Sequence, residues 1–163
     1  MPQAYFYDPA RDFNDNFDNG PFDLDQTPIE RDGEPTGEFL GFPVYAPFGI
    51  PAGPLPTSKH TSEAFRLGFD VVCYKTQRTV AFNPNQFPHV LSVQVDGDLT
   101  LEKASGQLVG KTTFPEDATK LTITNSFGNP SRGPEFWKDD LKAAVASEGK
   151  GQLLIMKIGR AHV

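Results

Sequence analysis

The chain has 163 residues, of which 37% are hydrophobic and 12% aromatic, and it carries a formal net charge of -6 at pH 7. These values suit one globular core, and the acidic balance argues against a surface for nucleic acid or anionic membranes. Cys73 is the single cysteine, which excludes a disulfide framework and a thiolate metal cluster and favours a reducing, cytoplasmic compartment. No apolar run reaches the roughly 18 residues of a transmembrane helix, so we expect no membrane partner.

Residues 1–38 are polar and acidic, with aromatic residues scattered among Asp, Asn, Pro and Gly. The aromatic residues show neither the period of a strand nor that of a helix, so no regular element is predicted there. We interpret 1–38 as an irregular arm that pins aromatic side chains onto a neighbouring surface, and the alternative is a mobile tail. The next residues, 39–45, predict a small strand or hairpin.

Residues 48–76 predict one β-α-β unit with parallel strands. Its first strand ends in the turn 51–53, where a glycine lets the backbone approach another group closely. Its helix is predicted over 58–67, with Ser58 or Thr61 as the N-cap.

The second strand of this unit is the apolar run from Val71 to Tyr74. A continuous apolar run is typical of a parallel strand covered on both faces. Lys75 follows directly, at the end of the strand that faces the ligand in α/β folds. We therefore expect Lys75 to lie in the functional site.

The second half of the chain predicts further elements. The segment 93–101 predicts a β-hairpin on an Asp96-Gly97 turn. A short strand-like segment at 121–124 leads into Asn125. The apolar spacing and Pro134 predict a helix over 134–148, and 152–156 begin another buried strand.

Three short motifs follow strand-like segments in order. They are Pro51-Ala52-Gly53, then Lys75-Thr76 with Thr79 and Asn83-Pro84, then Asn125-Ser126-Phe127-Gly128-Asn129-Pro130-Ser131. Together they resemble the dihydroorotate dehydrogenase family (class 1-like), FMN flavoenzymes with an eight-stranded barrel. The resemblance implies an α/β fold, the N-terminal half of a (β/α)8 TIM barrel. The arm (1–38) would precede a partial barrel (39–156), with the hairpin inserted above the barrel mouth.

The resemblance also implies site residues. Ala52, Gly53, Lys75 and Thr76 would bind FMN. Lys75, Asn125, Ser126, Phe127, Gly128 and Asn129 would bind the substrate, dihydroorotate or its product orotate. A fixed cation stabilises negative charge on a reduced flavin, and an amide matches the edge of a pyrimidine. The alternatives are a Lys75 that forms an ion pair at the barrel rim and an Asn125 that only shapes a turn.

The implied function is FMN-dependent oxidation of dihydroorotate to orotate in pyrimidine biosynthesis, by a cytoplasmic protein that is a homodimer at full length. The alternatives are an FMN oxidoreductase for another pyrimidine, similar to dihydropyrimidine dehydrogenase, and a non-catalytic α/β binding module. Family members have a serine at the position of Ala52 and an arginine at that of His89, and the loop differs at Asn129 and Ser131. These departures leave the exact pyrimidine open.

No residue is assigned as the catalytic base, because family members carry it on a loop after a later strand. Cys73 lies within a strand and is interpreted as a structural thiol. His60 and His89 lack partners at metal-ligand spacing, so we expect no metal site and interpret both as surface or loop residues.

The last residues form an unusual ending. Residues 158–163 read Ile-Gly-Arg-Ala-His-Val, which is also the translation of a widely used sequencing adapter. We therefore expect 157–163 to be a non-native tail on an N-terminal fragment that is itself inactive. The alternative is a genuine C-terminus.

Overall fold

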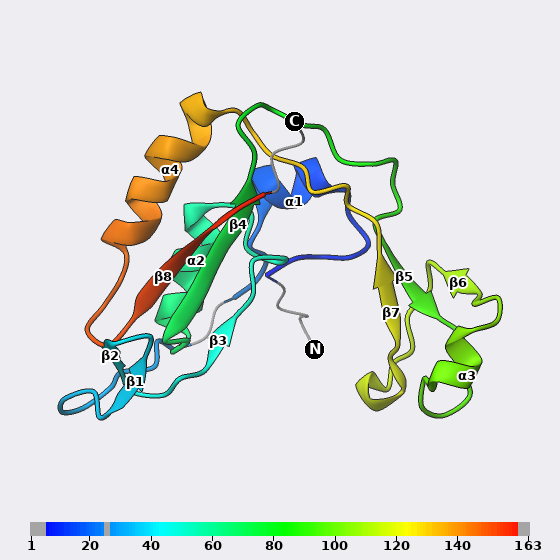
Figure 1. The fold of residues 1–163 in the computed structure, drawn as a ribbon, viewed down its shortest axis with the longest axis horizontal. Coiled ribbons are helices and arrows are strands. Elements are labelled where there is room, and N and C mark those ends of the chain that lie inside the picture. Colours follow the sequence, from blue (N-terminus) through cyan, green and yellow to red (C-terminus); the bar gives the residue numbers. More distant parts are fainter. Residues whose placement is uncertain (1–5, 25–26, 160–163) are drawn as a thin grey trace.

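The structure is a computed structural model and describes residues 6–24 and 27–159. A parallel sheet and an antiparallel sheet, each of three strands, lie beside each other, and a two-stranded hairpin precedes them (Figure 1). The helices and strands are α1 (Phe13–Asn19), β1 (Gly37–Phe39), β2 (Phe42–Val44), β3 (Gly49–Ile50), α2 (Ser58–Arg66), β4 (Val71–Gln77), β5 (Val90–Val93), α3 (Leu101–Ala104), β6 (Gly110–Lys111), β7 (Ile123–Asn125), α4 (Pro134–Ala146) and β8 (Leu153–Ile158), with a 3-10 turn at Ala118–Lys120.

The parallel sheet has the strand order β3-β4-β8, so β4 lies in its middle. Gly49 pairs with Val71, and Val71 pairs with Leu153, all in parallel register. A side chain at Gly49 would collide with the Val71 carbonyl, so only glycine fits there. The predicted β-α-β unit and the α/β class are confirmed. Within the described residues the parallel sheet is open and does not close into a barrel.

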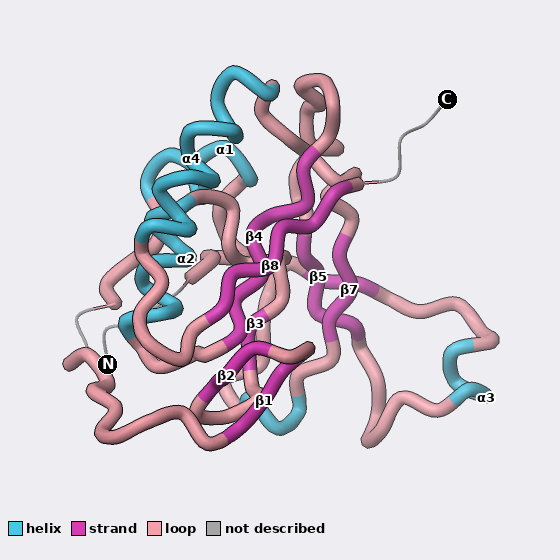
Figure 2. Tube along the Cα trace, turned by 60° about the vertical axis from the view of Figure 1, so that its left-hand side comes forward, coloured by secondary structure: helices cyan, strands magenta, loops and turns pink. Residues whose placement is uncertain are grey.

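The helices α2 and α4 cover one side of the parallel sheet, and the antiparallel sheet lies on its other side (Figure 2). The core on the helical side contains Leu55, Ala64, Phe65 and Val72, whose exposed fractions are 3% or less. Val72 and Tyr74 point to this side because alternate residues of a strand share a face. Burial of these side chains provides most of the stabilisation of this layer.

One carboxylate joins α2, α4 and β4. Asp140 of α4 accepts hydrogen bonds from the Ser58 backbone N–H at 2.8 Å and from the Ser58 hydroxyl at 2.6 Å. It also accepts one from the Tyr74 hydroxyl at 2.6 Å. A carboxylate at a helix N-terminus is favourable because the free N–H groups there carry partial positive charge. The predicted N-cap was wrong, because Thr57 holds that position and makes no side-chain capping bond.

The opposite face of β4 is covered only in part. Val71 and Lys75 are buried on this face, but Cys73 between them is half-exposed. Its register partner Ile155 on β8 is half-exposed too. The expectation of a strand buried on both faces therefore holds at the ends of β4 and not at its centre.

The second half of the chain forms the antiparallel sheet, with strand order β6-β5-β7. The predicted hairpin over 93–101 was wrong. Val93 ends β5, and Leu101 begins α3, which Thr100 caps by accepting a hydrogen bond from the Lys103 N–H. β5 instead pairs with strands that come later in the chain, so this part of the chain forms a three-stranded sheet.

The arm also differs from the expectation. Residues 13–19 form the helix α1, with Asp12 as an N-cap whose side chain accepts a hydrogen bond from Asp15 N–H. Phe13 and Phe17 lie four residues apart, on the same face of this helix, and both are buried. The arm does pin aromatic side chains onto the rest of the molecule, as predicted, but it does so with a regular element.

The predicted C-terminal helix is confirmed as α4, which has Pro134 in its first turn and ends at Ala146. A strand follows as predicted, β8, but its residues are half-exposed or exposed rather than buried. β8 extends to Ile158, beyond the segment 152–156 in which a strand was expected to begin. The predicted tail 157–163 falls partly in β8 and partly, at 160–163, outside the described residues, so its origin stays a prediction. Among the described residues, no helix is both long and apolar enough to span a bilayer.

Candidate functional site

A cavity of about 220 Å³ opens at the carboxyl end of β4. We call it the Lys75 pocket. Its lining residues are Phe13, Gly53, Lys75, Asn125, Phe127, Gly128 and Asn129. All of them except Phe13 are site residues that the sequence predicted, and they come from three separate segments of the chain. The fold therefore brings together most of the residues that the motifs singled out.

Lys75 lies between the pocket and the end of the sheet, and it is only 8% exposed. Its ammonium group donates to the Asn129 side-chain oxygen at 3.0 Å and to the Thr76 carbonyl at 3.3 Å. Burial, together with the positive charges of Lys157 and Arg78, lowers the pKa of Lys75 to about 8. Near neutral pH it remains mostly a cation, held by neutral oxygens.

Gly128 and Asn129 give the pocket its wall from the third motif, and both adopt positive φ angles, 76° and 53°. A side chain at Gly128 would meet the Asn85 side-chain oxygen at 2.5 Å and displace it, and the positive φ itself favours glycine there. Asparagine tolerates the left-handed conformation better than most residues. This backbone turns the Asn129 side chain toward Lys75.

Arg78 holds the same turn from outside the pocket. Its guanidinium donates from Nε to the Asn129 carbonyl at 2.9 Å and from Nη2 to the Gly128 carbonyl at 3.0 Å. The guanidinium also stacks on Phe82, with Cζ 3.8 Å from the ring centroid. The Arg78 carbonyl accepts from the indole N–H of Trp137 at 3.2 Å, which ties this residue to α4.

Phe127 is the aromatic side chain of the third motif, and two rings pack against it. Tyr7 meets it edge-on at 5.4 Å between centroids, and His89 lies against it at 5.3 Å. His89 is 2% exposed, and its Nε2 pairs with the Asn85 carbonyl at 2.9 Å. The interpretation of His89 as a surface or loop residue was therefore wrong in one respect: the residue is buried behind the pocket.

Asn125 is the last residue of β7, and Ser126 follows it. Asn125 is exposed and lines the pocket, where its amide can donate and accept at once. Ser126 does not line the pocket, and its hydroxyl accepts from the Asn85 side-chain amide at 3.1 Å. Pairing of Asn125 with Val90 in the antiparallel sheet fixes the entry of the chain into this loop.

Of the four predicted cofactor residues, Gly53 and Lys75 line the pocket and Ala52 and Thr76 do not. Gly53 lines the pocket, while Ala52 beside it is buried at 7% exposure. Thr76 follows Lys75 on β4 and does not line the pocket, because successive side chains of a strand point to opposite faces.

Cys73 and His60, which the sequence analysis also considered, do not line the pocket. Cys73 lies on β4, and burial raises the pKa of its thiol, an effect that the charge of Lys157 opposes. A protonated thiol outside the pocket suits the structural interpretation. His60 is fully buried between α2 and α1, where its Nδ1 pairs with the Thr57 hydroxyl at 2.8 Å. Its interpretation as a surface residue was wrong.

The sequence interpretation missed Phe13 and Arg78. A signal for Phe13 was present, because Asp12 is a good N-cap and Phe13 and Phe17 repeat at a helical spacing. Arg78 had no comparable signal, since its partners Gly128 and Asn129 lie about fifty residues away in the sequence.

The fold and the pocket together define an α/β protein with a buried cation, an amide and aromatic side chains at the carboxyl end of a parallel sheet. Over 93% of its length the chain is 33% identical to the dihydroorotate dehydrogenase of Dictyostelium discoideum, and it spans 43% of that protein's length. This similarity confirms the resemblance to the dihydroorotate dehydrogenase family that the three motifs predicted. The chain matches no protein-family model. No solved structure matches it either.

Proposed function

We propose that the chain is the N-terminal part of an FMN-dependent dihydroorotate dehydrogenase, which oxidises dihydroorotate to orotate in pyrimidine biosynthesis. The parallel sheet β3-β4-β8 is then the beginning of a (β/α)8 barrel, and the antiparallel sheet is an insertion at its mouth. The full-length protein is proposed to be a cytoplasmic homodimer.

The observation that carries this proposal is the convergence of the three motifs on one pocket. Gly53, Lys75 and Asn125 stand far apart in sequence, yet all three line the same 220 Å³ cavity. That volume suits a single small ring with its substituents, which is the size of a pyrimidine carboxylate. If the three motifs resembled the family only by chance, their residues would not need to meet in one pocket.

Each polar residue of the pocket has a distinct task in the proposed reaction. Lys75 binds the carboxylate or a ring oxygen of the substrate and stabilises the negative charge that develops there when the ring loses its proton. Asn125 donates to a ring carbonyl and accepts from a ring N–H, which orients the pyrimidine. Ser126, Phe127, Gly128 and Asn129 shape the pocket wall, and Asn129 also orients the Lys75 ammonium. We assign the proton-accepting base to no residue of this chain.

The residues present fit a flavin on two counts. No atom lies within 4 Å of the point where a side chain on Gly53 would begin, so a flat ring has room against this backbone. Lys75 is a buried cation without an ion-pair partner among the described residues, and it can face an electron-rich ring. We propose that Ala52, Gly53, Lys75 and Thr76 hold FMN, which when bound supplies the hydride acceptor.

The test is anaerobic reduction of the purified full-length flavoprotein, followed by loss of flavin absorbance. Dihydroorotate is expected to bleach the flavin and to yield orotate in an amount equal to the flavin reduced. Dihydrouracil, which lacks the carboxylate, is the matched substrate for the alternative oxidoreductase. Bleaching by dihydrouracil and not by dihydroorotate would assign the protein to that alternative, and bleaching by neither would refute both enzymes.

A further inference from the structure

We propose that the N-terminal segment 6–20 forms a wall of the substrate pocket and that Phe13 packs against the ring of the bound pyrimidine. This inference rests on the proposed function, because it assigns the ligand of the Lys75 pocket to that substrate class. Phe13 is then a binding and specificity residue, and the arm is part of the active site rather than a structural appendage.

The first observation is the position of Phe13. Among the described residues, it is the one lining residue of the Lys75 pocket that comes from the arm. Its side chain is 3% exposed, so the ring is fixed in place rather than free in solvent. In Figure 1 the helix α1 that carries it lies at the carboxyl end of β4, which is also the end where Lys75 stands.

A second contact joins the arm to the same pocket. Tyr7 packs edge-on against Phe127, which is itself a lining residue, with 5.4 Å between ring centroids. The arm therefore both contributes one aromatic lining residue and supports the other. A pocket with two aromatic side chains, a buried cation and an amide suits a planar, anionic ring better than a flexible chain.

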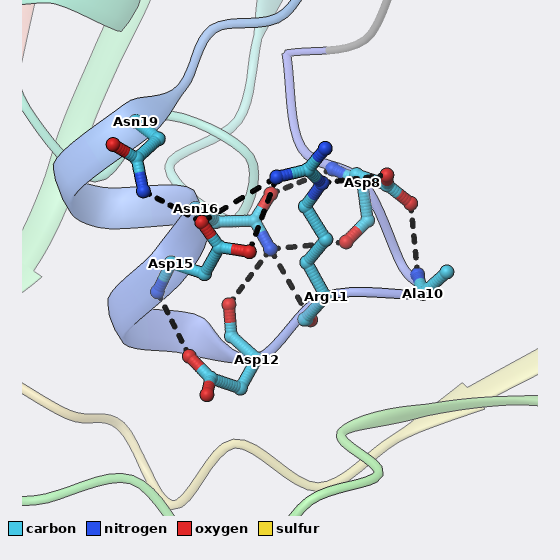
Figure 3. A network of polar contacts seen from close by, with 7 residues as sticks. All are labelled: Asp8, Ala10, Arg11, Asp12, Asp15, Asn16 and Asn19. Atoms are coloured by element: carbon cyan, nitrogen blue, oxygen red, sulfur yellow. Dashed lines mark hydrogen bonds and ion pairs between the residues drawn. The ribbon is translucent and has the colours of Figure 1, made fainter.

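Hydrogen bonds within the arm hold residues 8–16 in a fixed conformation, which a pocket wall requires. Asn16 is fully buried and acts as its centre (Figure 3). Its side-chain oxygen accepts from the Asp8 N–H at 2.6 Å, and its side-chain nitrogen lies 3.0 Å from the Asp8 carbonyl, 3.2 Å from that of Arg11 and 2.8 Å from that of Asp12. These contacts close residues 8–16 into a compact loop that carries Phe13.

The arm is also fixed to the rest of the protein. Phe17 packs on Phe136 of α4 at 5.3 Å between centroids, and Arg132 stacks over the Phe17 ring at 4.5 Å. Arg132 also forms an ion pair with Asp18 at 3.6 Å. Phe17 thus anchors α1, while Phe13, four residues earlier, faces the pocket.

The experiment measures orotate affinity of the full-length flavoprotein by titration calorimetry, and steady-state kinetics with dihydroorotate. Phe13→Leu is expected to weaken orotate binding about three- to tenfold, the factor that an aromatic ring contact contributes, and to raise KM more than it lowers kcat. Phe42→Leu, at an exposed phenylalanine of β2 that does not line the Lys75 pocket, is the matched control, and it should stay within about twofold of the wild type. Equal affinities for the two variants and the wild type would overturn the role of Phe13.

A second measurement needs no variant. Hydrogen exchange of the wild-type protein, with and without orotate, reports whether the arm contacts the ligand. Slower exchange of amides in 6–20 on adding orotate supports the inference, and unchanged exchange there overturns it. If orotate binds but dihydroorotate is not oxidised, the proposed reaction is wrong. The role of Phe13 is then still tested by the orotate affinity of Phe13→Leu. If orotate does not bind the wild type, both proposals fall.

Discussion

The ammonium group of Lys75 lies 3.0 Å from the side-chain oxygen of Asn129, and this amide takes the place where a buried lysine usually has a carboxylate. A buried cation is costly to desolvate, and a neutral amide offsets less of that cost than an ion pair does. The positive charge therefore remains available to an incoming anion. The left-handed turn at Asn129, which Arg78 holds, maintains this arrangement.

Lys75→Met in the full-length protein should lower flavin reduction by dihydroorotate roughly 100-fold or more and weaken FMN binding. Methionine has a similar length but removes the fixed charge, which solvent cannot replace without reorganising. The fold should survive, because an apolar side chain suits a buried site. Lys142→Met on α4, where the lysine side chain is 78% exposed, is the control and should behave as the wild type. A yellow Lys75→Met protein that is reduced normally would remove Lys75 from the site.

The lowered pKa of Lys75 predicts that orotate binding depends on pH, and this can be measured in the wild type and in Lys75→Met. Above its pKa of about 8 the free lysine is neutral, so binding of an anion must take up a proton there. Orotate affinity should be flat below pH 8 and fall above it, by up to tenfold for each pH unit. Lys75→Met should lack this fall, which separates Lys75 from any titration of orotate itself. The same fall in both proteins would contradict the assignment.

Arg78→Lys should weaken orotate binding about tenfold while FMN remains bound. Lysine keeps the charge, but it cannot donate to the Gly128 and Asn129 carbonyls from a rigid planar fork. The turn should then relax and release the Asn129 side chain from Lys75. Equilibrium dialysis against orotate and the flavin absorbance of the dialysed protein measure the two quantities.

The control for Arg78 is Arg31→Lys. Arg31 also donates to a carbonyl, that of Gly68 at 2.9 Å, but it does not line the Lys75 pocket. Its replacement should leave orotate affinity unchanged. If Arg78→Lys binds orotate as tightly as Arg31→Lys does, the two carbonyl contacts of Arg78 do not position the site.

Asn125→Ala should raise the KM for dihydroorotate with FMN still bound. Each buried hydrogen bond lost to the substrate should cost about 1–3 kcal/mol. Thr124→Ala, at the neighbouring exposed residue of β7, should leave KM unchanged because its side chain points to the other face of the strand. Loss of FMN with unchanged substrate kinetics would instead place Asn125 in the cofactor site.

The elements that the sequence predicted are those with a local signal. The apolar run before Lys75 and the proline at the start of α4 each depend on a few neighbouring residues, so β4 and α4 were expected close to their observed bounds. The three motifs predicted the Lys75 pocket for a similar reason. The first two motifs lie at the carboxyl ends of β3 and β4, which are parallel neighbours and therefore meet at one edge of the sheet. The third motif follows β7 of the antiparallel sheet, so its place in the pocket does not follow from that rule.

The failures concern partners that are distant in the chain. Gly97 does adopt the positive φ of 66° that its turn predicted, but Thr100 caps the short helix α3 where the second hairpin strand was expected. β5 then pairs with β6 and β7, a choice that depends on packing between segments rather than on the turn. The contacts of Arg78 with the third motif are of the same kind. No short window of sequence contains them.

The last prediction concerns the 163-residue chain when it is expressed alone. Two large apolar side chains of the described residues are exposed on or next to the edge strands of the parallel sheet, Phe48 at 66% and Ile158 at 73%. The face around Cys73 is half-exposed as well. Free strand edges with apolar neighbours favour pairing between copies, so we expect the chain to self-associate.

We also expect no stoichiometric FMN binding and no oxidation of dihydroorotate, because the chain spans 43% of the length of its relative. Size-exclusion chromatography with light scattering, an FMN titration and a dihydroorotate assay test the three expectations, with the full-length protein as the positive control. A soluble monomer that binds one FMN and turns over would show that these 163 residues contain a complete site, and the proposal of an N-terminal part would then be wrong.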